Sequence, residues 1–173
     1  MMQIIRAELR ELALPLLEPF VISGGTMTER RSLLVVLHDG DGHVGYGESP
    51  PFELPFYSEE TLASARDTIG RVLLPRIAGR VFDSPEALDA ALRIGVRGNP
   101  FARAAIETAA WDLEAARRDT GLAALLAERL GVAPSATIPC GVALGIPTDR
   151  SIGTLERWIA GAVSVGYRRV KIK

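Results

Sequence analysis

The order of the predicted elements constrains the fold of this chain more than any single motif does. Residues 3–14, 32–38 and 43–48 read as strands, and Asp39-Gly40-Asp41-Gly42 suits a hairpin turn between the last two. Helical patterns then take over. Three successive strands followed by a block of helices predict an α+β domain with a three-stranded antiparallel sheet.

Four helices are expected after these strands. A start at Ser58 opens the first helix, which contains Pro75 near its end and should be strained there. Ser84-Pro85-Glu86 opens the second helix, and Asn99-Pro100 opens the third. The predicted helices span residues 58–79, 85 to 95 or 98, 101–118 and 122–130.

Two irregular stretches interrupt these elements. Residues 15–31 contain Ser23-Gly24-Gly25-Thr26 and are predicted to form a long flexible loop between the first two strands. Residues 49–57 are rich in proline and aromatic side chains, which is compatible with a lid over a ligand or with packing on the helix beneath. Loops of this length are often functional.

The pattern changes again near residue 134. An apolar segment at 137–146, a helix at about 151–165 and a strand at 168–173 form one βαβ unit with parallel strands. The first of these strands has almost no polar residues, as expected when both faces of a sheet are covered. One such unit cannot bury its own faces, so we expect it to begin a larger α/β domain.

The last strand holds both lysines of the chain, Lys171 and Lys173. Lysine and arginine together number 20, and all the others are arginine. A lysine amine can give up its proton and act as a base, which arginine cannot do in a protein. Alternation places both amines on one face of the strand, where each lowers the other's proton affinity. The alternative is a basic strand end that faces water.

Composition excludes several classes of function. The net charge is −1, the arginines are scattered among 21 acidic residues and only 6% of residues are aromatic, which does not favour nucleic-acid binding. No apolar run approaches the roughly 20 residues that span a bilayer, and the N-terminus lacks a secretory pattern, so we expect no membrane partner and a cytoplasmic location. Cys140 is the single cysteine and is predicted to be buried.

Four motifs in register resemble those of the enolase superfamily, in the muconate-lactonizing-enzyme subgroup. Within it the chain is most similar to the branch of o-succinylbenzoate synthase and N-acylamino acid racemase. The motifs are Gly45-Tyr46-Gly47-Glu48, residues 97–113 from Arg-Gly-Asn-Pro to Trp-Asp-Leu, Gly141-Val142-Ala143-Leu144-Gly145-Ile146 and Gly166-Tyr167-Arg168-Arg169-Val170-Lys171-Ile172-Lys173.

This resemblance implies an N-terminal capping domain over residues 1–133 and a modified TIM barrel of which residues 134–173 supply the first two strands. It also implies an enzyme that removes the proton next to a carboxylate of a small-molecule substrate. Lys173 would be the base and Lys171 its electrostatic support. A divalent metal, as a rule magnesium, would stabilise the enediolate.

By the family pattern the metal ligands lie on later barrel strands, so no metal ligand is expected in this chain. We therefore expect the full-length protein to be the active enzyme and a homo-oligomer, and the 173-residue chain alone to be inactive. Glu48, Glu107 and Asp112 match motif positions that are interpreted as structural, buried and hydrogen-bonded.

The resemblance also suggests substrate contacts. Phe20, Ser23, Gly24 and Gly25 on the first loop and Phe52 and Tyr57 on the second are candidates for the pocket wall, although Phe20 could equally be a packing residue. Ala143 stands where related chains often carry serine, which removes one polar contact to the substrate.

Two other functions remain open from the sequence. One is a dipeptide epimerase or cycloisomerase of the same superfamily, which specificity residues on the last barrel strands would distinguish. The other is a non-catalytic binding module built from the capping domain.

Overall fold

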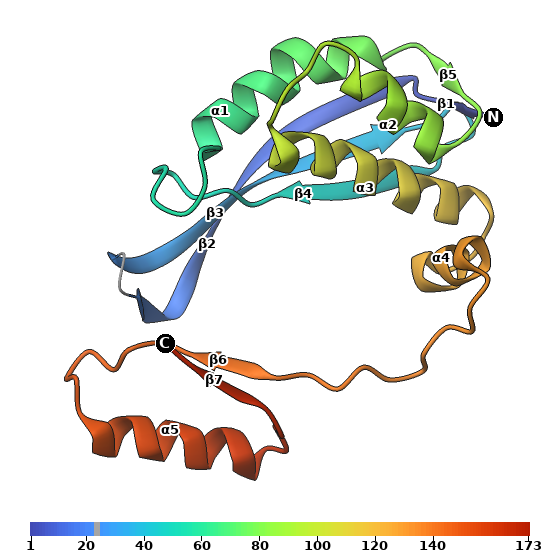
Figure 1. Cartoon of the computed structure of the whole chain (residues 1–173). Helices are drawn as coiled ribbons and strands as arrows, with labels where there is room; N and C mark the ends of the chain where they lie inside the picture. Colours follow the sequence, from blue (N-terminus) through green and yellow to red (C-terminus); the bar gives the residue numbers. More distant parts are fainter. Residues whose placement is uncertain (23–24) are drawn as a thin grey trace. The chain divides into compact units, whose positions relative to one another are not determined.

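The computed structural model describes residues 1–22 and 25–173. These residues form two compact units (Figure 1). The first unit contains Met1–Ala13 and Arg31–Pro134, and the second contains Leu14–Arg30 and Ser135–Lys173. Among the described residues, none of the helices combines the length and the apolar character that a bilayer-spanning segment requires.

The sheet has the strand order β2-β3-β4, formed by Arg6–Ile22, Gly25–His38 and Val44–Ser49. β3 and β4 are antiparallel, from the pair Leu33 and Ser49 to the pair His38 and Val44. A short strand β1 (Met2–Gln3) pairs with β5 (Val81–Phe82).

The prediction of a long flexible loop at residues 15–31 is wrong for the described part of that stretch. β2 continues to Ile22, and β3 begins at Gly25. Pairing between two strands satisfies backbone groups whatever the local side-chain pattern, so the ladder extends beyond the alternating core segment. Ser23 and Gly24 lie outside the described residues.

The helical block contains α1 (Leu62–Asp67), α2 (Pro85–Arg93), α3 (Pro100–Arg117) and α4 (Leu122–Leu130). The single helix predicted for residues 58–79 is instead divided into three parts. α1 passes into a π-helical segment, η1 (Thr68–Leu73), and then into a 3₁₀ turn, η2 (Leu74–Arg76), which contains Pro75. Proline has no amide hydrogen to donate, so it favours this change of helical type.

Helix α3 packs along β4, and two glycines of the first motif allow their backbones to approach closely. A Cβ atom on Gly47 would overlap the Ala105 carbonyl oxygen, and one on Gly45 would overlap the Ala109 carbonyl oxygen. The facing side of α3 presents small buried residues. The core of the first unit includes Leu33, Val35, Leu37, Ile69, Leu73, Leu88, Leu92, Ile106 and Leu113.

Two carboxylates accept hydrogen bonds from backbone N–H groups, one on β4 and one at the start of α3. The backbone N–H of Tyr46, on edge strand β4, donates to Asp112 Oδ2 at 2.9 Å. Glu60 is 4% exposed, and its carboxylate accepts from the backbone N–H groups of Phe101 (2.7 Å) and Ala102 (3.0 Å) in the first turn of α3. A negative charge at this position also interacts favourably with the helix dipole.

Replacement of Glu60 by alanine is expected to lower the free energy of unfolding by about 2–3 kcal/mol, because two charge-assisted hydrogen bonds are lost and a buried amide is left unpaired. Glu60→Gln, which keeps one strong acceptor, should have an intermediate effect. Urea denaturation followed by circular dichroism measures the change. Glu59→Ala, at the exposed neighbouring position, is the matched control. An equal effect of the two alanine variants would contradict this role.

The second unit contains the predicted βαβ arrangement. β6 (Val142–Leu144) pairs in parallel with β7 (Val170–Ile172), and α5 (Ile152–Ser164) connects them. Together with the antiparallel sheet and its helices, this arrangement confirms the predicted fold class. Cys140 precedes β6 and is exposed, so the prediction of a buried cysteine is wrong. Its position ahead of the short strand pair leaves its side chain uncovered.

Candidate functional site

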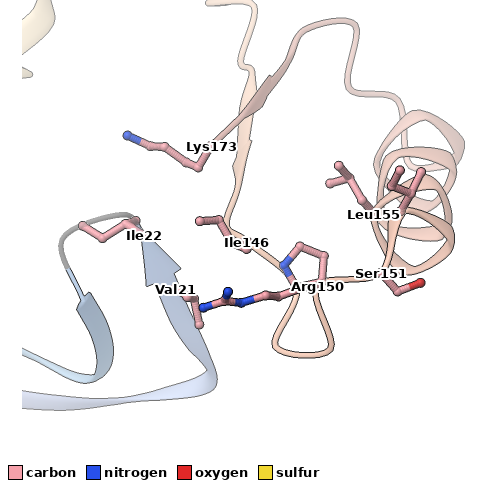
Figure 2. A pocket seen from close by; sticks show the side chains of 9 residues that line it. Val21, Ile22, Ile146, Arg150, Ser151, Leu155 and Lys173 are labelled. Carbon is pink, nitrogen blue, oxygen red and sulfur yellow. The ribbon is translucent and has the colours of Figure 1, made fainter.

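A cavity of about 450 Å³ lies at the carboxyl ends of β6 and β7 in the second unit (Figure 2). Ile146 and Arg150 follow β6 along the chain, and Lys173 follows β7. Val21 and Ile22, at the end of β2, also line the cavity. Carboxyl ends of parallel strands are where α/β barrels and open α/β sheets bind their substrates.

Backbone hydrogen bonds hold these segments together. The backbone N–H of Ile146 donates to the Val21 carbonyl at 2.9 Å, and that of Lys173 donates to the Leu144 carbonyl at 3.2 Å. The second bond carries the β6–β7 pairing one residue beyond Ile172. The Lys173 backbone is therefore fixed, while its side chain projects from the strand end (Figure 2).

Of the two predicted catalytic residues, Lys173 lines this cavity. Lys171 does not line it and stands opposite Ala143 in the strand register. Both lysine side chains are exposed.

Phe20 and Ala143 line a different cavity of the second unit, together with Trp158. This cavity has a volume of about 480 Å³. The Phe20 ring packs so closely on the end of β6 that a Cβ atom on Gly145 would lie 3.3 Å from it. This contact favours the packing role for Phe20. Gly25 is the exposed first residue of β3, and the candidates Ser23 and Gly24 lie outside the described residues.

Phe52 and Tyr57 belong to an aromatic cluster on the loop between β4 and α1, in the first unit. The Phe52 ring stacks on Phe56 with centroids 5.0 Å apart, and the Tyr57 ring meets Phe52 edge-on at 5.8 Å. Tyr57 is 77% exposed. The backbone N–H of Leu62 donates to the Phe52 carbonyl at 2.9 Å and closes the base of the loop. The cluster therefore presents ordered apolar surface.

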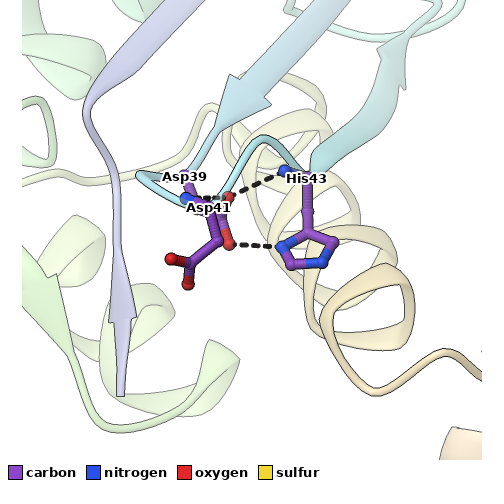
Figure 3. A group of neighbouring side chains, drawn as sticks. All are labelled: Asp39, Asp41 and His43. Atoms are coloured by element: carbon purple, nitrogen blue, oxygen red, sulfur yellow. Dashed lines mark hydrogen bonds and ion pairs between the residues drawn. The ribbon is translucent and has the colours of Figure 1, made fainter.

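Among the described residues, one group could offer three metal-ligand atoms within 4.8 Å of one another, namely Asp39, Asp41 and His43 (Figure 3). Asp39 already accepts from the backbone N–H groups of Asp41 (3.0 Å) and His43 (2.8 Å) and from His43 Nδ1 (2.9 Å). Arg117 Nε also lies 3.1 Å from Asp39 Oδ2.

Burial would raise the pKa of Asp39, but the hydrogen bonds from the His43 side chain and from two backbone amides outweigh it and hold the pKa below its ordinary value. With its oxygens occupied and an arginine beside it, this carboxylate stabilises the turn between β3 and β4. The group does not fit a metal site.

The three acidic residues interpreted as structural have different surroundings. Asp112 and Glu107 are half-buried and accept hydrogen bonds from the Tyr46 backbone and from Trp111 Nε1, respectively. Glu48 is exposed, so the expectation that it is buried is wrong. It lies at an outward position of edge strand β4, between the buried residues Gly47 and Ser49.

Residues 4–127 match the model of the mandelate racemase / muconate lactonizing enzyme N-terminal domain. The chain belongs to this family. The resemblance to the enolase superfamily that the four motifs indicate is thereby confirmed.

Three relatives illustrate the family relationship. An N-succinylamino acid racemase of Thermus thermophilus is 42% identical over 99% of this chain and 44% of its own length. An o-succinylbenzoate synthase of Enterococcus faecalis is 35% identical over 99% of this chain and 45% of its own. The crystal structure of an enolase-superfamily member from Listeria innocua superposes with a TM-score of 0.87 at 35% identity, over 99% and 44% of the two chains. The chain thus spans less than half the length of the relatives it matches.

Sequence reasoning missed Arg150 and Phe56. Arg150 lies in the turn after the first strand of the βαβ unit, and the rule that sites form at carboxyl strand ends could have indicated it. Phe56 lies within the aromatic loop, but no sequence signal distinguishes a ring that stacks on its neighbour from one that packs elsewhere.

Proposed function

We propose that the full-length protein is an enzyme of the enolase superfamily that removes the proton next to a carboxylate, and that Lys173 is the base. The observation that carries this proposal is the cavity at the carboxyl ends of β6 and β7, which Lys173 lines. A lysine amine in its neutral form can take this proton.

The other residues of the cavity would assist this step. The apolar side chains of Val21, Ile22, Ile146 and Leu155 limit access of water to the reacting carbon. Lys171, on β7 but outside the lining of the cavity, is proposed to contribute positive charge to the developing enediolate from a greater distance.

A divalent metal, with magnesium as the expected ion, belongs to this proposal because a carbon acid of this kind needs stabilisation of its enediolate. Such a metal would supply electrostatic stabilisation. No group among the described residues fits the metal, because Arg117 and three hydrogen-bond donors already engage Asp39.

For the substrate we propose N-acyl amino acids with hydrophobic side chains, or the cyclohexadiene precursor of o-succinylbenzoate. Support comes from the relatives named N-succinylamino acid racemase and o-succinylbenzoate synthase. The exposed aromatic cluster of Phe52, Phe56 and Tyr57 is proposed to contact the apolar part of the substrate. Three further residues are proposed as substrate contacts with less support, because they do not line the cavity that Lys173 lines. They are Phe20, Gly25 and Ala143.

A substrate panel tests the proposed function. The purified full-length protein is incubated in deuterated buffer with magnesium and with N-succinyl amino acids, N-acetyl amino acids, the cyclohexadiene precursor or charged dipeptides. We expect deuterium incorporation or dehydration with the first three classes, measured by mass spectrometry. A clear preference for dipeptides would refute the proposed substrate class, and inactivity on the whole panel would favour a non-catalytic module.

A further inference from the structure

The cavity at the carboxyl ends of β6 and β7 contains a second basic residue, Arg150, for which the proposed proton transfer has no use. Lys173 and Arg150 reach this cavity from different elements, Lys173 from the end of β7 and Arg150 from the turn after β6 (Figure 2). A base must be neutral when it takes a proton, whereas a guanidinium remains charged. Arg150 is therefore the permanent cation of the cavity during the proposed reaction.

A tight turn determines the position of Arg150. Its backbone N–H donates to the Pro147 carbonyl at 2.9 Å, and its φ of 51° lies in the left-handed region. This conformation is disfavoured for a residue with a Cβ atom. The next residue, Ser151, caps α5, with its Oγ accepting from the Thr154 backbone N–H at 3.4 Å. The cap and the turn together hold Arg150 beside the strand end.

The nearest acidic residue in the sequence is engaged elsewhere. Asp149 accepts from the Ser151 backbone N–H at 2.9 Å and from Thr154 Oγ1 at 2.7 Å. These hydrogen bonds, with the charge of Arg157, hold the pKa of Asp149 below its ordinary value. Its carboxylate therefore stays charged and directed at the start of α5. Within residues 1–22 and 25–173, no ion pair to the Arg150 guanidinium is found.

The remaining wall of the cavity is mainly apolar. Val21, Ile22, Ile146 and Leu155 contribute hydrocarbon surface, and Ser151 adds a hydroxyl group. A volume of about 450 Å³ falls within the usual range for small-molecule sites. An apolar wall with a guanidinium suits a ligand whose methylene groups lead to a carboxylate, because the planar guanidinium can bind both carboxylate oxygens.

We propose that Arg150 is a specificity-determining residue that binds a second carboxylate of the substrate, at the far end of the acyl group from the carbon that Lys173 deprotonates. This inference rests on the proposed function. In this role Arg150 would favour acyl amino acids whose acyl group ends in a carboxylate over those whose acyl group is uncharged.

The test compares two substrates that differ only in this feature, the N-succinyl and N-acetyl derivatives of the same hydrophobic amino acid. Full-length Arg150→Gln is expected to raise the ratio of KM for the succinyl substrate to KM for the acetyl substrate by about 10- to 100-fold, as loss of a hydrogen bond between charged groups predicts. The kcat for the succinyl substrate should change little, because this contact is present equally before and during the reaction.

Two further variants make the experiment specific. Arg150→Lys keeps the charge but loses the planar guanidinium, so it should shift the KM ratio less than Arg150→Gln does. Arg157→Gln removes an exposed arginine of α5 whose guanidinium donates to Thr154 Oγ1 at 2.7 Å and which does not line the cavity. This control should leave the KM ratio at the value of the unmodified enzyme.

The outcomes are distinguishable. If Arg150→Gln changes KM for both substrates equally, or for neither, Arg150 does not bind the second carboxylate and the inference is wrong. A loss confined to kcat would also overturn it. Should the unmodified enzyme process neither these two substrates nor the cyclohexadiene precursor, the proposed function is wrong and the role assigned to Arg150 is wrong with it. Should it dehydrate the precursor alone, the proposed function stands, but Arg150 does not distinguish acyl amino acids and the inference is wrong.

Discussion

Lys173→Arg in the full-length protein is expected to slow exchange of the substrate's α-proton with deuterated solvent by about 10²- to 10⁴-fold, the usual contribution of a positioned general base. Arginine keeps the positive charge and much of the side-chain length but stays protonated in proteins, so it cannot accept the proton. The measurement is deuterium incorporation by mass spectrometry, started separately from each enantiomer.

The controls for this result concern fold and charge. The Lys173 side chain is exposed and its backbone hydrogen bond to Leu144 does not depend on the side chain, so circular dichroism of the variant should be unchanged. Lys171→Arg preserves the charge that Lys171 is proposed to supply and should slow exchange less than Lys173→Arg does. If the Lys173→Arg variant exchanges the α-proton of both substrate enantiomers at nearly the original rate, Lys173 is excluded as the base.

Gly47→Ala is expected to lower the free energy of unfolding of the first unit by about 3 kcal/mol or more, at or beyond the upper end of overpacking effects. The new methyl group would overlap the Ala105 carbonyl oxygen and lie 2.6 Å from Thr108 Oγ1 and 2.7 Å from the Ala109 nitrogen. Most of these contacts are helix backbone, which cannot rotate away as a side chain can. Helix α3 must therefore move away from β4.

Tryptophan fluorescence during urea denaturation measures this change. Of the two tryptophans, Trp111 lies in α3 and Trp158 in α5, so a Trp158→Phe background assigns the signal to the first unit. Gly70→Ala is the matched control, since its nearest neighbour would be Leu9 at 3.9 Å, an ordinary contact. Similar denaturation midpoints for the two variants would contradict a steric requirement for glycine at position 47.

Local signals explain why much of the fold could be predicted. The turn at Asp39 to Gly42, the helix start at Ser84 and the extent of α4 all depend on neighbours within a few residues. Ser84 Oγ accepts from the Ala87 backbone N–H at 3.2 Å, as the Ser-Pro-Glu pattern predicts. Such interactions join residues that are close in the sequence and need no tertiary contact.

Predictions failed where a partner distant in the sequence supplies the interaction. Asn99-Pro100 opens α3 as predicted, but the Asn99 side chain makes no capping hydrogen bond and its φ is 52°, which the sequence did not indicate. The carboxylate of Glu60, about forty residues earlier in the chain, caps this helix instead. In the same way, β2 and β3 extend beyond their alternating segments because each strand provides hydrogen-bonding partners for the other.

The sequence by itself determined the family and the α+β block followed by a βαβ unit, and it supplied Lys173 and Lys171 as candidates for the base, because a motif and its spacing are properties of the chain alone. Only the tertiary structure separated Lys173, which lines the cavity, from Phe20, which packs on Gly145, and brought Arg150 to the same strand ends as Lys173. The physical reason is that burial and proximity depend on which segments meet in space, and local sequence patterns do not encode the packing between segments far apart in the chain.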